Sequence, residues 1–291
     1  MFWTNTVWYI LLGLTIIAEL AYTLYRAENR RQAVAFYITL SGMTLWLETV
    51  LLIFLKSYAY YPGIITDPAR WYDDILAGNL FSQFSIAASM LMVAVLRLKT
   101  RWYIVLALAY GAMEILFQML GIYEHFWYRT WYTVALLPFA FWLARKMYDR
   151  LCGGLRPMYY YIYVAFALFA LVVITLWWGL GLADIQLGND KLLADPHISR
   201  YGVTVCMHVI ISTALLWAYF SGMKWRYKAL VLAALEAMYY AVYRLGWVWI
   251  SPGWFVPASV FVLLCTYASV ALMDRLYGLS IPALKLYSTR K

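Results

Sequence analysis

Four acidic side chains lie within stretches of sequence that are otherwise almost entirely apolar, and they are the first candidates for chemistry. They are Glu19, Glu48, Glu114 and Glu236. An acid near the middle of a bilayer costs about 2.5–3.5 kcal/mol on insertion scales, so such residues face a protein interior or a wet cavity. At about 1.5 Å per helical residue, Glu19 and Glu236 lie nearer the cytoplasm, and Glu48 and Glu114 lie nearer the outside. This arrangement is the one expected of a ladder for protons or cations.

A structural role explains the same four residues equally well. A neutral Glu that accepts hydrogen bonds from Tyr hydroxyl or Trp indole groups is an ordinary contact between membrane helices. The chain has 27 Tyr and 15 Trp residues to offer. Both interpretations therefore stay open for each carboxylate.

Other polar side chains lie close to these acids in the sequence. Gln118 follows Glu114 by one helical turn and is an expected partner. Tyr240 and Arg244 follow Glu236 at i+4 and i+8, on the same helical face. Because Arg244 is then about 12 Å from Glu236, a direct ion pair is not expected. Arg244 either lines a cavity with Tyr240 or extends to the membrane surface.

Three further residues are candidate ligand contacts. His208 lies on an apolar helix, where it either packs or contacts a ligand, and it has no His or Cys at i±3 or i±4. Asp67 and Asp195 each precede a proline in a long polar loop. We expect no metal site and no cofactor, because these residues lack metal-ligand spacing and the cysteines lack a CxxC pair.

The composition indicates a membrane protein. Hydrophobic residues make up 65% of the 291 residues and charged residues 13%, whereas soluble domains are about half apolar and a quarter charged. A span of roughly 20 apolar residues crosses the hydrocarbon region as a helix that satisfies its own backbone hydrogen bonds. We therefore predict an all-α polytopic membrane protein with about nine spans. They are expected at 7–25, 33–56, 79–97, 102–122, 130–148, 159–182, 202–222, 228–249 and 254–273.

The basic residues predict the orientation. Of the 23 Lys and Arg residues, six are expected in one set of alternate loops, namely Lys56, Arg70, Arg129, Lys191, Arg200 and Arg244. The other 17 are expected in the opposite set, namely Arg26, Arg30, Arg31, Arg97, Lys99, Arg101, Arg145, Lys146, Arg150, Arg156, Lys224, Arg226, Lys228, Arg275, Lys285, Arg290 and Lys291. The positive-inside rule then predicts a multi-pass cell-membrane protein with its N-terminus outside and its C-terminus cytoplasmic.

The chain also shows an internal repeat. Motifs of the first half recur in order in the second half at a distance of about 122 to 125 residues, such as Asp149-Arg150-Leu151 and Asp274-Arg275-Leu276. We predict a leading helix with its loop (1–32) and two parallel four-helix copies (33–156 and 157–291). The acids Glu114 and Glu236 would occupy corresponding helices, face the protein interior and share a polar environment between the copies.

The motifs resemble those of a small bacterial family of four-helix membrane proteins without a settled activity. In that family a Glu-bearing helix ends in Leu-Gly and a Gly-Trp opens the last span, as in Leu120-Gly121 and Gly253-Trp254 here. The first copy departs from the pattern at Thr130, where Gly is usual. The resemblance implies a tandem duplicate of that module, and it supplies no catalytic residue.

The helix layout is also similar to that of EXPERA-type membrane domains, whose four helices include a long polar outer loop after the first span. The run Asp67-Pro68-Ala69-Arg70-Trp71 carries this similarity, although Asn79 stands where an acid is expected. The similarity implies a pocket within the membrane for sterols or other lipids.

Three function classes fit the sequence. They are gradient-driven transport or ion conduction through the carboxylates, binding or modification of a lipid or hydrophobic ligand, and an assembly or sensor subunit without catalysis. No nucleotide-binding or hydrolase motif occurs, and whether the protein is an enzyme stays open. The net charge of +9 lies in short basic collars, which predict membrane lipids rather than nucleic acid as partners. Oligomers are compatible with all three classes.

The topology can be checked by labelling introduced cysteines. We expect Asp67→Cys and Asp195→Cys, in a chain without its native cysteines, to react with an impermeant thiol reagent from the same, outer side of the membrane. Labelling of the two positions from opposite sides would contradict a parallel repeat.

Overall fold

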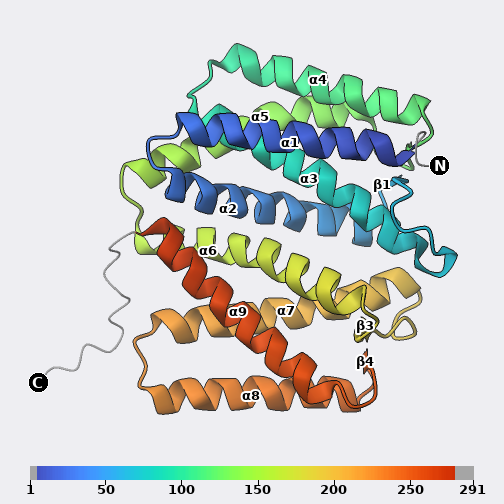
Figure 1. Ribbon diagram of the computed structural model, residues 1–291, viewed down its shortest axis with the longest axis vertical. Helices are drawn as coiled ribbons and strands as arrows, with labels where there is room; N and C mark the ends of the chain where they lie inside the picture. The colour runs from blue at the N-terminus through green and yellow to red at the C-terminus, as the bar shows by residue number, and fades with distance from the viewer. Residues whose placement is uncertain (1–4, 279–291) are drawn as a thin grey trace, which may run out of the picture. The chain divides into compact units, whose positions relative to one another are not determined.

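The protein is an all-α membrane protein. A computed structural model describes residues 5–278 (Figure 1). It is 77% helical and contains nine α-helices, which confirms the predicted fold class. The basic tail residues Lys285, Arg290 and Lys291 lie outside the described range.

Seven of the helices in residues 5–278 are long and apolar enough to cross a membrane. They are α1 (Val7–Arg26), α2 with the π-helix η2 (Arg30–Phe54), α3 (Trp71–Val95), α4 (Thr100–Met119), α6 with the π-helix η4 (Pro157–Gly181), α7 (Pro196–Phe220) and α9 (Phe255–Tyr277). The other two are α5 (Thr130–Cys152) and α8 (Trp225–Arg244), where spans were also expected. Helix α5 ends in a basic segment, and α8 carries charged residues from its first turn to its last.

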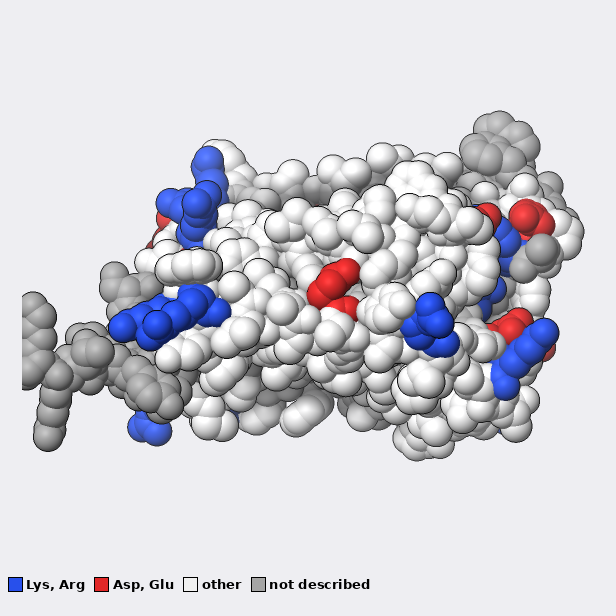
Figure 2. Space-filling view, turned by 90° about the horizontal axis from the view of Figure 1, so that it is seen from below, with Lys and Arg blue, Asp and Glu red and all other residues white. Residues whose placement is uncertain are grey.

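The surface agrees with a membrane environment. Large apolar side chains such as Ile17 and Leu264 are 65% and 64% exposed, which a lipid-facing surface permits and water does not favour. Figure 2 shows one face of the molecule, where Lys and Arg gather near the two ends and the middle is uncharged apart from one acidic spot. The protein is therefore an integral membrane protein.

The chain folds as two compact units, Met1–Gly154 and Leu155–Lys291, which we call the first unit and the second unit. In the first unit, α3 packs against α1, α2 and α5, and α4 packs against α5. A short antiparallel ladder joins β1 (Tyr58–Tyr60) to β2 (Tyr123–His125), with Tyr58 opposite His125. This ladder ties the loop after α2 to the loop after α4.

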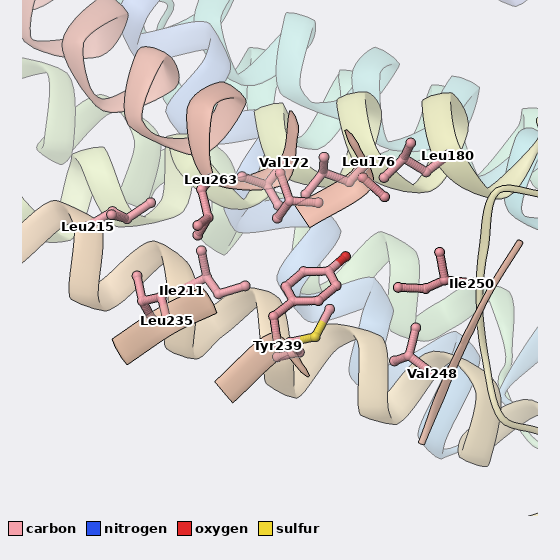
Figure 3. Close-up of a cluster of buried hydrophobic side chains, with 13 residues drawn as sticks. Val172, Leu176, Leu180, Ile211, Leu215, Leu235, Tyr239, Val248, Ile250 and Leu263 are labelled. Carbon is pink, nitrogen blue, oxygen red and sulfur yellow. The ribbon is translucent and has the colours of Figure 1, made fainter. Parts of the chain in front are cut away.

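The second unit has α6, α7, α8 and α9, with α9 packed against both α6 and α7. Its ladder joins β3 (Gln186–Gly188) to β4 (Val248–Ile250), with Gln186 opposite Ile250. Its core is apolar and extends from α6 and η4 through α7 and α8 to β4 (Figure 3).

Two helices begin more than one helical turn earlier than the hydropathy predicts. The expected spans started at residues 79 and 202, whereas α3 starts at Trp71 and α7 at Pro196. Acidic side chains are favourable at the positive end of a helix. Asp73 and Asp74 lie in the first turn of α3, and Asp195 caps α7, so polar residues that end a hydropathy window begin these helices instead.

From α3 and α7 onward, the same series of helices occurs in both units with the same lengths. Helices α3 and α7 have 25 residues, α4 and α8 have 20, and α5 and α9 have 23. Their first residues differ by 125 in each case (71 and 196, 100 and 225, 130 and 255), as do those of β2 and β4 (123 and 248). Residues can therefore be matched at this spacing, while common descent from one module stays a prediction.

The Leu-Gly motifs have a local physical cause. Gly121 and Gly246 follow α4 and α8 with φ of +68° and +70°, a conformation that side chains disfavour and glycine adopts freely. Each glycine ends its helix and turns the chain into the following strand. Matched from these ends, Glu114 corresponds to Tyr239, and Glu236 lies three positions before Tyr239. The structure thus differs from the sequence-based pairing of the two acids.

Candidate functional site

Polar side chains converge where the β1–β2 ladder meets the helices of the first unit. We call Glu48, Tyr58, Glu114, His125 and Thr133 the hairpin cluster. They come from five elements: the last residue of α2, the first of β1, helix α4, the last residue of β2 and the first turn of α5. The ladder is what brings them together, because it places Tyr58 and His125 opposite each other.

Glu114 has partners for both of its carboxylate oxygens. The Nε2 atom of His125 lies 2.6 Å from Oε1, and the Thr133 hydroxyl donates to Oε2 at 2.6 Å. The Glu114 and His125 side chains are only 10% and 9% exposed. A carboxyl group and an imidazole at this distance form a hydrogen bond, in which the role of the ring nitrogen follows its tautomer. Glu114 therefore faces the protein interior, as predicted.

Glu48 is buried with a single close donor. The Tyr58 hydroxyl donates to Oε1 at 2.5 Å, and the Gln83 amide lies beside the carboxyl group. The other oxygen has no hydrogen-bond partner among residues 5–278. The chain enters the π-helix η2 directly after Glu48, and π-turns often occur at functional sites.

Aromatic rings surround the cluster. Tyr58 contacts Tyr60, Tyr123 and Tyr128 at ring-centroid distances of 5.6, 5.4 and 5.0 Å, and Tyr123 lies 5.0 Å from His125. Burial raises the pKa of Tyr58 and of Tyr123 well above the usual value, and it raises the pKa of Tyr128 to about 12. These tyrosines therefore remain neutral hydroxyl groups that can donate or accept hydrogen bonds.

A second polar group lies deeper in the same unit, around Glu19. The Tyr110 hydroxyl is 2.9 Å from that of Ser85 and 3.0 Å from that of Ser89, and Ser89 lies beside the Glu19 carboxyl group. Gln83, next to Glu48, and Ser89 are six residues apart on α3, or about 9 Å along its axis. Polar side chains of α3 therefore extend from the hairpin cluster to Glu19.

The predicted partner of Glu114, Gln118, has a different role. Its amide donates to the Thr130 hydroxyl at 3.3 Å and to the backbone carbonyl of Glu114 at 3.4 Å. The contacts of Gln118 thus tie α4 to the start of α5. They leave both carboxylate oxygens of Glu114 to His125 and Thr133.

Among the candidate residues of the second unit, the hydrogen bonds of the described range join only Arg244 to Tyr240. Glu236 accepts a hydrogen bond from the Ser259 hydroxyl at 2.7 Å, and its second oxygen is buried without a partner among residues 5–278. Arg244 donates to the Tyr240 hydroxyl at 3.3 Å, and both side chains are exposed. His208 is buried, and its Nε2 has no partner within the described range.

The two loop aspartates also differ in role. Asp195 caps α7, because its carboxylate accepts from the backbone N–H groups of His197 and Ile198 at 3.0 Å. Asp67 is exposed, and its backbone carbonyl accepts from the N–H of Arg70. The carboxylate that organises the first loop is Asp74, which accepts from the N–H groups of residues 63, 64 and 65.

The matched positions of the second unit hold no such cluster. Glu114, Tyr123, His125 and Thr133 correspond to Tyr239, Val248, Ile250 and Ala258, which all belong to the apolar core. Figure 3 shows Tyr239 lying among apolar side chains that include Val248 and Ile250. The Tyr239 hydroxyl donates to the side chain of Gln186. Only the first unit therefore carries a buried carboxylate–histidine pair at this place.

Comparison of the chain with protein-family models, with curated proteins and with solved structures finds no match. The relationships that the Leu-Gly and Gly-Trp motifs imply therefore stay predictions. What the hairpin cluster does must follow from its own geometry.

Replacing Tyr58 by Phe tests the cluster's contribution to stability. The change removes the hydroxyl that donates to Glu48 and leaves a buried carboxyl group without a close donor. We expect Tyr58→Phe to lower the free energy of unfolding by about 1–2 kcal/mol, as for other hydrogen bonds between membrane helices. Chemical denaturation of the purified protein measures it.

Tyr22→Phe is the matched control, because Tyr22 is 53% exposed. In the double variant Tyr58→Phe/Glu48→Gln the two losses should not add, since both changes remove the same contact. A Tyr58→Phe protein as stable as Tyr22→Phe would show that the contact contributes nothing.

Proposed function

We propose that this integral membrane protein conducts protons, or cations in exchange for protons, through its first unit. The observation that carries the proposal is the hairpin cluster, in which the Glu114 carboxyl group is hydrogen-bonded to His125 at 2.6 Å and that of Glu48 to Tyr58 at 2.5 Å. Ionisable groups inside membrane proteins commonly mark ion pathways and proton relays. An ion gradient would supply the energy.

Each side chain of the cluster has a role in this proposal. His125 and Glu114 accept and release the proton, because one proton serves both groups. Thr133 holds the second oxygen of Glu114 and fixes the direction of the carboxylate. The neutral hydroxyl of Tyr58 both donates and accepts, so it can pass a proton to or from Glu48.

The route continues along α3 toward Glu19 in this proposal. Gln83 lies beside Glu48, and Ser89 lies beside Glu19, with Ser85 and Tyr110 hydrogen-bonded nearby. The Glu19 carboxyl group has one buried oxygen without a partner among residues 5–278, which leaves it able to accept a proton. The sequence predicts different membrane depths for Glu19 and Glu48, as a ladder of proton carriers requires.

The second unit serves as a scaffold in this proposal. The positions that match Ser85, Ser89 and Tyr110 are Ile210, Ala214 and Leu235, none of which can carry a proton. We also propose that both units descend from one four-helix module, which the equal element lengths support. The cell-membrane location and the outer N-terminus are part of the same proposal, and they rest on the distribution of Lys and Arg.

Replacing Glu114 by Gln tests the proposal, because Gln keeps the shape and the hydrogen bonds but cannot titrate. We expect Glu114→Gln to reduce pH-driven flux in proteoliposomes to the rate of protein-free liposomes. The measurement is the decay of a pH gradient reported by an entrapped dye.

Glu236→Gln is the matched control, since it removes a titratable group that contacts Ser259 outside the cluster. Its flux should equal that of the wild type. Both variants should have the elution volume and the melting temperature of the wild type. A loss of flux then cannot be attributed to misfolding. Wild-type flux in the Glu114→Gln protein would sink the proposal.

A further inference from the structure

A pocket with both apolar and charged lining residues opens at the strand end of the second unit, where α7 begins and α8 ends. Its volume is about 790 Å³. The walls come from β3, the loop that follows it, the N-terminal part of α7, the last turn of α8, and β4. Four ionisable side chains line it with charges of both signs, and cations are in excess: Lys191, Arg200, Arg244 and Asp190.

Hydrogen bonds hold the walls of the pocket in place, and most of them involve Asn189. Its side-chain amide donates to the carbonyl of Gly246 at 2.6 Å, and its backbone N–H donates to the carbonyl of Trp247 at 2.9 Å. The Ser199 hydroxyl donates to the carbonyl of Asn189 at 2.6 Å, and the N–H of Lys191 donates to its Oδ1 at 2.8 Å. One residue thus joins the loop, the turn before β4 and α7.

The cations of the pocket lack acidic partners. Within residues 5–278, none of Lys191, Arg200 and Arg244 forms an ion pair with a carboxylate, and Arg244 donates only to a tyrosine hydroxyl. The arginines in the strand-side loops of the first unit differ. There Arg70 pairs with Asp73 at 3.2 Å, and Arg129 donates to two backbone carbonyls. Cations that share a pocket and have no acidic partner indicate an anionic ligand.

The position of these cations in the chain strengthens that indication. Lys191, Arg200 and Arg244 are all the Lys and Arg residues that the described part of the second unit has at this end of its helices, and all three line the pocket. Basic residues are sparse at this end, and they are concentrated at the opposite end of the helices. The cations at this end of the second unit therefore lie together in the pocket.

We propose that this pocket binds a phosphate group, either that of an acidic phospholipid or that of a soluble phosphate ester. The planar guanidinium groups of Arg200 and Arg244 match phosphate oxygens, and Lys191 adds a third positive charge. Trp249, which is half exposed beside the pocket, suits the headgroup level of a bilayer. The site is independent of the proton route in the first unit.

Binding to the full-length protein tests this proposal. The variant is the double substitution Arg200→Gln/Arg244→Gln, and the matched control is Arg226→Gln/Lys228→Gln, which removes two cations at the opposite end of α8. The probes are inorganic phosphate and nanodiscs that contain phosphatidylglycerol or only phosphatidylcholine. Native mass spectrometry counts retained phospholipid, and thermal stabilisation reports phosphate binding.

We expect the wild type and the control to retain phosphatidylglycerol or to be stabilised by phosphate. The Arg200→Gln/Arg244→Gln protein should bind at least about tenfold more weakly, because it loses charge-assisted hydrogen bonds. Retention of lipid without a response to phosphate identifies a headgroup site, and the reverse identifies a soluble ligand. If the folded Arg244→Gln protein loses binding, Arg244→Lys, which keeps the charge, should retain part of it.

Equal binding by the Arg200→Gln/Arg244→Gln protein and the control would overturn the proposal. The absence of any response to either probe in the wild type would overturn it as well. Neither result depends on proton flux, so the proposal for the pocket and the proposal for the hairpin cluster are tested independently.

Discussion

A carboxyl group within a bilayer must be neutral or must be matched by donors, because the surrounding hydrocarbon offers neither water nor ions. The first unit meets this constraint at Glu114 through His125 and Thr133, and at Glu48 through Tyr58. The two-stranded ladder makes these contacts possible, since it draws residues from two distant loops to one place. Helix packing, the β1–β2 ladder and the chemistry of the site thus depend on the same hydrogen bonds.

The two units show how one scaffold can hold different contents. The last three helices of each unit match in length, yet the first unit buries a carboxylate–histidine pair where the second buries Tyr239 and Ile250. The second unit instead gathers unpaired cations in a pocket at its strand end. The two units therefore differ in where they place ionisable groups: the first has them in its core, and the second has cations in a pocket at its strand end.

The sequence was sufficient for the fold class, because apolar spans and basic collars follow from the bilayer itself. It also predicted the inward position of Glu114, and that Arg244 and Glu236 form no direct ion pair, which holds within residues 5–278. It did not predict that His125 meets Glu114 or that Tyr58 meets Glu48. Those contacts depend on the ladder between β1 and β2, and three-residue strands carry too little periodicity to be predicted. The pairing of Glu114 with Glu236 followed motif spacing, whereas helix ends align Glu114 with Tyr239.

Whether Glu114 and His125 share a transferable proton is the central question, and infrared titration of the purified protein in lipid addresses it directly. The C=O stretch of a protonated carboxylic acid is separate from that of a carboxylate, so protonation of a single Glu can be followed against pH. The account predicts a carboxyl band that is absent from Glu114→Gln and whose titration shifts in His125→Gln. A titration that neither substitution changes would contradict it.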